Sequence, residues 1–190
     1  MFTLAELARA CDGKLINISE DDAQGVVIGR VSKDTREITS DGSNTIYVAI
    51  IGERFDGHEF SDKAYENGAV AVLVSNPSKI PEGCPAVLVE DTVKAYGIAA
   101  KLYRFKLNAK VICVTGSVGK TSTREMIAKA LSSSKRVFST KANQNNEIGL
   151  PSTILDAPSD TEVLVLEMGM RLRGEILYLT NIACPDIAVI

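Results

Sequence analysis

The sequence has no apolar run long enough to cross a membrane and no marked excess of charge of either sign. Its formal net charge of −3 gives no general attraction to nucleic acid or to an anionic membrane surface. The N-terminal stretch MFTLAELARACDGK is interrupted by charged residues, so we do not expect a signal peptide. These absences favour a protein without a nucleic-acid partner and without a membrane-inserted segment.

Cysteine and histidine are few and scattered. The four cysteines form no C-x-x-C pair, and Cys11 and Cys113 fall in apolar patterns typical of small buried side chains. His58 is the single histidine and has no second histidine with which to bind a metal ion. We therefore expect a cytoplasmic protein in a reducing setting, without a disulfide framework or a zinc site.

What the sequence does contain is an alternation of strand and helix patterns, which predicts an α/β fold. Thr3 and Glu6 have the spacing of a capping box, and the helix that they start is expected to end near Gly13. The short polar stretch 106–110 is expected to join two domains, 1–105 and 106–190. In the first domain we expect strands over 26–31, 45–50, 69–74 and 86–89, and helices over 60–68 and 92–105.

The second domain has nearly continuous apolar strands, which are typical of a parallel sheet covered on both faces. A helix is expected to begin near Thr121, and a short one near Pro151, because proline suits a first helical turn. The strands are expected over 111–115, 136–140, 162–167 and 186–190.

The stretch TGSVGKT, residues 115–121, predicts a phosphate-binding loop between a strand and a helix. The usual pattern G-x-x-x-x-G-K-[ST] has a glycine where this chain has Val114, which shortens the loop. Lys120 is expected to neutralise the β- and γ-phosphates. The residues expected to surround the nucleotide are Gly116, Ser117, Val118, Gly119, Lys120, Thr121 and Ser122. The alternative is a glycine-rich structural turn with an exposed lysine.

Two further stretches follow the loop. Glu167 ends an expected strand at the edge of the sheet where α/β proteins bind ligands, and with Thr121 it suits Mg²⁺. In NQNNEIGLP, Asn145 and Asn146 are candidate substrate-binding residues, the alternative being a polar loop before a helix. For Arg171 and Arg173 there are two interpretations, contact with substrate anions and a solvated basic turn, of which the turn is preferred.

The first domain offers a hydroxyl at Thr35 and a guanidinium at Arg36, which suits phosphate or carboxylate. A glycine-containing loop follows, in which backbone amides could meet a uracil or pyrophosphate. Its candidate substrate-binding residues are Arg54, Asp56, Gly57 and His58, with the His58 side chain expected to act as neither base nor metal ligand.

Four motifs in order resemble the Mur ligases, which build the peptide of peptidoglycan: DTREITSDGSNTIYVAIIGERFDGHEF, TGSVGKT, NQNNEIGLP and LEMGMRLRGEI. The phosphate loop is also similar to that of the folylpolyglutamate synthases. The resemblance implies a UDP-substrate-binding α/β domain followed by a parallel-sheet ATP-binding domain. It implies a magnesium ligand at Glu167, a catalytic role for Lys120, and amide formation through an acyl phosphate.

The closest resemblance is to members of the family that join D-alanyl-D-alanine to UDP-N-acetylmuramoyl-tripeptide with ATP and Mg²⁺. Further along their sequence, members of that family have a magnesium-binding lysine, a histidine and a third domain. The counterparts of these are not among residues 1–190. We therefore expect a truncated chain that is inactive without the C-terminal part of the same enzyme. The alternatives are the family member that adds the third amino acid, a generic P-loop kinase or NTPase, and a non-catalytic module that binds a nucleotide sugar.

Overall fold

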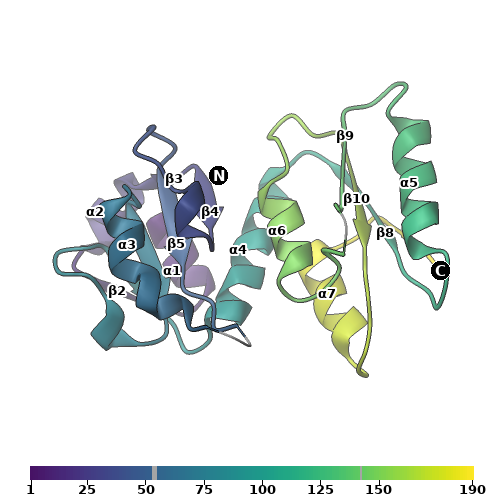
Figure 1. The fold of residues 1–190 in the computed structure, drawn as a ribbon. Helices are drawn as coiled ribbons and strands as arrows, with labels where there is room; N and C mark the ends of the chain where they lie inside the picture. Colours follow the sequence, from purple (N-terminus) through teal and green to yellow (C-terminus); the bar gives the residue numbers. More distant parts are fainter. Residues whose placement is uncertain (53–54, 142) are drawn as a thin grey trace. The chain divides into compact units, whose positions relative to one another are not determined.

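The computed structural model describes residues 1–52, 55–141 and 143–190. The chain divides into two units, residues 1–99 and 100–190, and the division falls within the long helix α4 (Thr92–Lys106). Both units are built from a mainly or wholly parallel sheet with helices (Figure 1). The predicted α/β fold is therefore confirmed. Within the described ranges, no helix is both long and apolar enough to cross a membrane.

The first unit contains a five-stranded sheet in the order β2-β7-β6-β5-β4, in which only the β2–β7 pairing is antiparallel. A separate antiparallel pair joins β1 to β3. The strands are β1 (Phe2–Thr3), β2 (Lys14–Ile16), β3 (Val27–Ile28), β4 (Arg30–Ser32), β5 (Thr45–Val48), β6 (Ala71–Val74) and β7 (Ala86–Leu88). The helices before α4 are α1 (Leu4–Ala10), α2 (Glu20–Gly25), η1 (Thr35–Glu37), η2 (Gly57–Phe60), α3 (Ser61–Glu66) and η3 (Pro77–Lys79).

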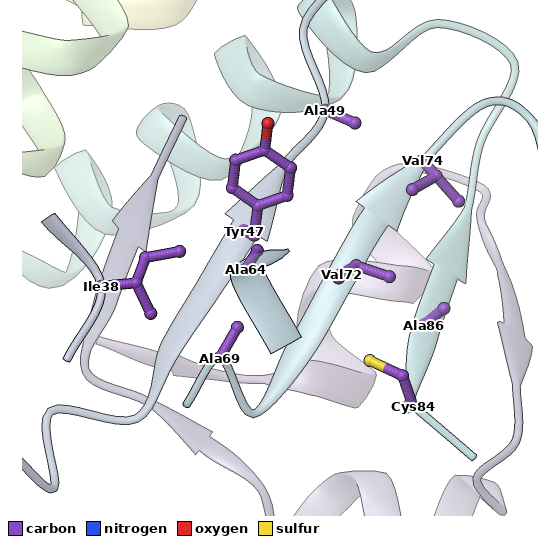
Figure 2. Close-up of a cluster of buried hydrophobic side chains, with 9 residues drawn as sticks. All are labelled: Ile38, Tyr47, Ala49, Ala64, Ala69, Val72, Val74, Cys84 and Ala86. Atoms are coloured by element: carbon purple, nitrogen blue, oxygen red, sulfur yellow. The ribbon is translucent and has the colours of Figure 1, made fainter. Parts of the chain in front are cut away.

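A core of small and branched side chains fills one face of this sheet. Figure 2 shows Tyr47 and Ala49 on and just after β5 beside Val72 and Val74 on β6, each pair two residues apart and so on one face. Ala64 of α3 completes the cluster, which places α3 over that face. Every residue of β5 and β6 is buried, as expected for central strands covered on both sides.

The second unit contains a four-stranded parallel sheet in the order β11-β8-β10-β9. Helix α5 packs on one face, where Ile127 and Leu131 contact Val114, Val163 and Val165; α6 and α7 cover the other face (Figure 1). The elements are β8 (Lys110–Val114), α5 (Lys120–Leu131), β9 (Val137–Ser139), α6 (Gly149–Leu155), β10 (Val163–Glu167), α7 (Glu175–Ala183) and β11 (Ile187–Val189).

Local sequence signals predicted α1 but missed α2, although the side chain of its N-cap Ser19 accepts from Asp22 N–H. The predicted capping box is confirmed, because Thr3 Oγ1 accepts from Glu6 N–H and Glu6 Oε2 accepts from Thr3 N–H. Its helix ends at Ala10, earlier than expected. The sequence analysis did not predict α7. Its N-cap residue Gly174 has a left-handed backbone conformation, and no side chain of the described chain caps the helix.

Candidate functional site

The phosphate-loop motif connects the end of β8 to the start of α5. Gly116 and Gly119 have φ angles of 141° and 80°, a region that non-glycine residues rarely adopt. A Cβ added at Gly116 would meet its nearest neighbour only at 3.7 Å, so backbone conformation, and not space, requires glycine there. The two glycines therefore shape the turn that exposes the helix N-terminus.

The N-terminus of α5 is open to an anion. Gly119 is its cap residue, and no described side chain caps the first turn. Ser117, Val118, Thr121 and Ser122 are all exposed around it. Unpaired N–H groups at a helix N-terminus attract phosphate through hydrogen bonds and the helix dipole.

Lys120 folds back over this loop. Its Nζ donates to the carbonyl oxygen of Gly116 at 2.7 Å and reaches that of Ser117 at 3.5 Å. The ammonium group is thus held beside the exposed helix N-terminus by neutral carbonyl oxygens. A phosphate oxygen is a stronger acceptor for an ammonium group than a carbonyl, so the same side chain can turn to a bound nucleotide.

Glu167 is the buried carboxylate of the site, with a residue exposure of 3%. It ends β10 opposite Val114 of β8, which places it beside the phosphate loop. Its Oε2 accepts from the Thr121 hydroxyl at 2.9 Å, and its Oε1 accepts from Asn145 Nδ2 at 2.9 Å. Both carboxylate oxygens therefore have donors from other elements, as a buried charge requires.

The Thr121–Glu167 pair fits a magnesium ion by its chemistry. A hydroxyl and a carboxylate are hard oxygen ligands, and Mg²⁺ in nucleotide sites binds one or two carboxylates together with phosphate oxygens and water. No cluster of three or more histidine, cysteine, aspartate or glutamate side chains able to hold a metal occurs in the described parts of the chain. Phosphate oxygens and water would have to complete the coordination, as is usual for Mg²⁺.

The two candidate asparagines differ in their contacts. Asn145 bonds Glu167 through its side chain, and its carbonyl oxygen accepts from Gly169 N–H at 2.8 Å. Asn146 Oδ1 accepts from Gly149 N–H at 2.8 Å, which holds the start of α6. Both side chains are thus engaged within the protein, although both residues border a cavity.

That cavity has a volume of about 700 Å³. Lys120 and the asparagine loop line one part of it, and the loop between β10 and α7 lines another. The lining residues are Lys120, Asn145, Asn146, Glu147, Gly169, Met170, Arg171, Leu172, Arg173, Gly174, Glu175, Tyr178 and Leu179. The structure therefore brings together three separate stretches of the second unit at one edge of its sheet.

In the first unit, Thr35 and Arg36 lie in η1. Arg36 donates to the Asp34 carboxylate with an N–O distance of 2.6 Å, although its side chain is 86% exposed. The hydrogen bonds from the Arg36 side chain and backbone lower the pKa of Asp34 to about 2. Arg36 is thus available to solvent but already paired with a neighbouring carboxylate.

Asp56, Gly57 and His58 lie at the start of η2, whereas Arg54 falls outside the described residues. His58 is buried, with its Nδ1 2.6 Å from Asp56 Oδ1. Its Nε2 accepts from Ser75 N–H at 2.9 Å, so the ring proton lies on Nδ1 and is donated to Asp56. The backbone hydrogen bond from His58 also lowers the pKa of Asp56. The imidazole thus ties η2 to the end of β6.

Sequence reasoning missed two residues that support the site. Thr140 follows β9, and its hydroxyl accepts from Glu167 N–H at 3.0 Å. The buried Arg124 of α5 donates to the carbonyl oxygen of Thr140 and thereby ties α5 to the end of β9. The available signal for Thr140 was its position at the end of an expected strand, on the same sheet edge as Glu167.

The chain is similar in sequence to known protein families and to a curated protein. Residues 28–104 match the family described as "Mur ligase family, catalytic domain", and residues 114–190 match the "Mur ligase middle domain". The UDP-N-acetylmuramoyl-tripeptide–D-alanyl-D-alanine ligase of Bacillus subtilis (strain 168) is 43% identical over 99% of this chain, which covers 40% of that protein.

Two solved structures agree with this match. A crystal structure of MurF from Acinetobacter baumannii has a TM-score of 0.84 and 32% identity, over 98% of this chain and 40% of that one. MurF ligase from Thermotoga maritima in complex with ADP has a TM-score of 0.75 and 36% identity, over 84% of this chain and 36% of that one. The chain thus spans about 40% of the length of the curated relative and belongs to the Mur ligase family.

Proposed function

We propose that this chain takes part in ATP-dependent amide ligation in the cytoplasm, joining D-alanyl-D-alanine to UDP-N-acetylmuramoyl-tripeptide in the synthesis of a peptidoglycan precursor. The Bacillus subtilis relative carries the name of this reaction. For the residues in hand, the proposal is that 106–190 bind Mg·ATP and that 1–105 bind the UDP end of the substrate. No contact among the described residues favours a kinase, a nucleotide-sugar module or the ligase that adds the third amino acid over this reaction.

The observation that carries the nucleotide assignment is the hydrogen bond between Thr121 and Glu167. It joins the first turn of the phosphate-loop helix to a buried carboxylate at the end of the neighbouring strand. A structural turn would need neither a buried charge nor an uncapped helix N-terminus. Burying a carboxylate is costly, so its presence beside the loop favours a ligand of opposite charge.

The proposed reaction has two steps. The substrate carboxylate attacks the γ-phosphorus of ATP, which gives an acyl phosphate and ADP. The amine of D-alanyl-D-alanine then attacks the acyl carbon, so that an amide forms, phosphate leaves and the amine loses a proton. Both steps bring anionic or electron-rich groups together, so charge neutralisation and positioning are the main requirements.

The residues of the loop would meet part of this requirement. The N–H groups at the start of α5 hold the phosphates, and Lys120 neutralises charge between the γ-phosphate and the approaching carboxylate. When Mg²⁺ is bound by Thr121 and Glu167, it supplies further neutralisation of the β- and γ-phosphates. Asn145 keeps the Glu167 carboxylate oriented.

In the first unit, we propose that the Thr35 hydroxyl and the Arg36 guanidinium bind the diphosphate. Arg36 is exposed and would exchange its neighbour Asp34 for a phosphate, which accepts bidentate hydrogen bonds equally well. Asp56 and Gly57 would contribute through the backbone of their loop. His58 would act by holding that loop, because both of its ring nitrogens are already engaged.

The test is calorimetric titration of the chain with Mg·ADP. Lys120→Ala should weaken binding about 10- to 100-fold, the range expected for losing a hydrogen bond to a charged group. Lys129→Ala, on the exposed far part of α5, is the matched control and should bind as the parent does. If the Lys120 variant bound as tightly as the control, the loop would be only a structural turn.

Activity needs a separate measurement. Phosphate release from ATP should depend on both UDP-N-acetylmuramoyl-tripeptide and D-alanyl-D-alanine in an enzyme of the length of the relatives. We expect residues 1–190 alone to release none, because the entropy saved by holding three reactants together is worth about 7–11 kcal/mol and needs all their binding groups. Dipeptide-dependent turnover by residues 1–190 would contradict this placement of the catalytic groups.

A further inference from the structure

Two arginine side chains that line the cavity have no hydrogen-bond or ion-pair partner in the described chain. Arg171 and Arg173 lie on the loop between β10 and α7, both are exposed, and neither guanidinium makes a hydrogen bond or ion pair within the described ranges. Every other described arginine has a carboxylate within 4.0 Å. Those six are Arg9, Arg30, Arg36, Arg104, Arg124 and Arg136.

The loop that carries these arginines has an ordered backbone. The Glu175 carboxylate accepts from the N–H groups of Arg171 and Leu172 at 2.6 and 3.1 Å. These backbone hydrogen bonds, together with the charge of Arg171, lower the pKa of Glu175, whose carboxylate is thus engaged by the main chain. This arrangement holds the backbone of the loop and leaves both guanidiniums without a hydrogen bond to a carboxylate in the described chain.

The cavity has a cationic excess. Lys120, Arg171 and Arg173 line it with three positive charges, against the two negative charges of Glu147 and Glu175. Guanidinium groups bind carboxylates bidentately through two parallel hydrogen bonds, whereas an ammonium group acts as a point charge. An anion in this cavity would therefore meet Lys120 in one part and the planar arginine donors in another.

We propose that Arg171 and Arg173 bind the peptide carboxylates of the acyl-donor substrate and so hold the reacting acid beside the phosphate loop. This inference rests on the proposed function. A carboxylate that approaches ATP is repelled by the phosphates, and a pair of unpaired arginines on the same cavity offsets that repulsion. The two side chains would thereby select an acidic peptide terminus over a neutral one.

The test compares UDP-N-acetylmuramoyl-tripeptide with its analogue in which the peptide carboxylates are carboxamides. The parent chain should bind the acid about tenfold tighter than the amide, the difference expected for a charge-assisted contact. In Arg171→Ala/Arg173→Ala this preference should fall to about one, with affinity for the amide unchanged. The charge-preserving Arg171→Lys/Arg173→Lys should retain part of the preference, and Lys129→Ala all of it.

A titration with Mg·ADP separates the two proposals. If the arginine variant kept its preference for the acid while Mg·ADP bound normally, the inference would be wrong and the proposed function would stand. If the variant lost Mg·ADP affinity instead, the arginines would be phosphate contacts, which also overturns the inference. If the parent bound neither Mg·ADP nor the UDP-linked peptide, the proposed function would fail and the inference with it.

Discussion

The two units arrange their candidate polar groups in different ways. In residues 100–190, Glu167 takes its hydrogen bonds from Thr121 and Asn145, which are 46 and 22 residues away in the sequence. In residues 1–99, Asp34 bonds Arg36 and Asp56 bonds His58, each two residues further on. One site is assembled by the sheet, and the other by short turns.

The difference has an energetic consequence. Glu167 is buried, and removing its donors would leave an uncompensated charge in a low-dielectric environment. The Asp34–Arg36 pair is at the surface, where an ion pair contributes little because water screens it. The first arrangement therefore holds the Glu167 carboxylate in place, whereas the second leaves the exposed Arg36 side chain able to exchange partners.

The largest expected effect is on the assembled site. Glu167→Gln keeps the shape of the side chain but removes the charge, so the dependence of ADP affinity on Mg²⁺ should disappear. We expect Mg·ADP affinity to fall about 100-fold, near the upper range for interactions of a charged group. Calorimetry with and without Mg²⁺ measures this. An unchanged dependence on Mg²⁺ would place the metal ligand elsewhere, and the contrast between the Glu167 contacts and the turns of the first unit would then have no bearing on metal binding.

His58→Ala tests whether the Asp56–His58 turn of the first unit depends on the hydrogen bond between His58 and Ser75, which lie 17 residues apart. The variant leaves Ser75 N–H without its acceptor and should lower the free energy of unfolding of that unit by about 2 kcal/mol, the cost of an unsatisfied buried group. Denaturant unfolding followed by near-ultraviolet circular dichroism of the tyrosines measures it. Ser75→Ala keeps the N–H group and is the control, expected to cost less. Equal losses in both variants would contradict a special role for the imidazole.

Asn145→Ala tests, within the second unit, whether a contact between distant residues supports the Glu167 carboxylate. The variant removes one donor to Glu167 but keeps the backbone bond between Asn145 and Gly169. Mg·ADP affinity should fall about tenfold, since the carboxylate loses part of its orientation but not its charge. Asn146→Ala, which loses a contact to the start of α6, should affect folding stability more than nucleotide affinity. If Asn146→Ala lowered Mg·ADP affinity more than Asn145→Ala did, Asn146 and not Asn145 would be the residue that supports the nucleotide site.

The smallest effect is expected for Arg36→Ala at neutral pH. The pKa of Asp34 is lowered from 3.8 to about 2, so the stability that this group contributes is complete above pH 3.8 and is lost as the pH falls through about 2. The variant should raise the pKa of Asp34 but leave the unfolding midpoint at pH 7 nearly unchanged. A carboxyl titration by NMR measures the pKa. A large loss of stability at pH 7 would show that the surface pair matters more than its exposure indicates.

Prediction from the sequence worked best where the cause is local. The capping box of α1, the left-handed glycines of the phosphate loop and the apolar periods of β5, β6, β8 and β10 all involve residues close in the chain. It failed for α7, which has no capping side chain at its start in the described chain, and for β2, which has one exposed and two partly buried residues. Weak local signals left these elements to be determined by packing.

The alternation of strands and helices, the position of the phosphate loop and the placement of Glu167 at the end of a strand follow from the sequence, because these depend on neighbouring residues. Which groups meet depends on the tertiary structure. The burial of Glu167 between Thr121 and Asn145, the support from Thr140, and the bond from Ser75 to His58 each require strands or helices distant in the chain to pack together. Such pairings depend on sheet order and register, which the periodicity of a single strand does not specify.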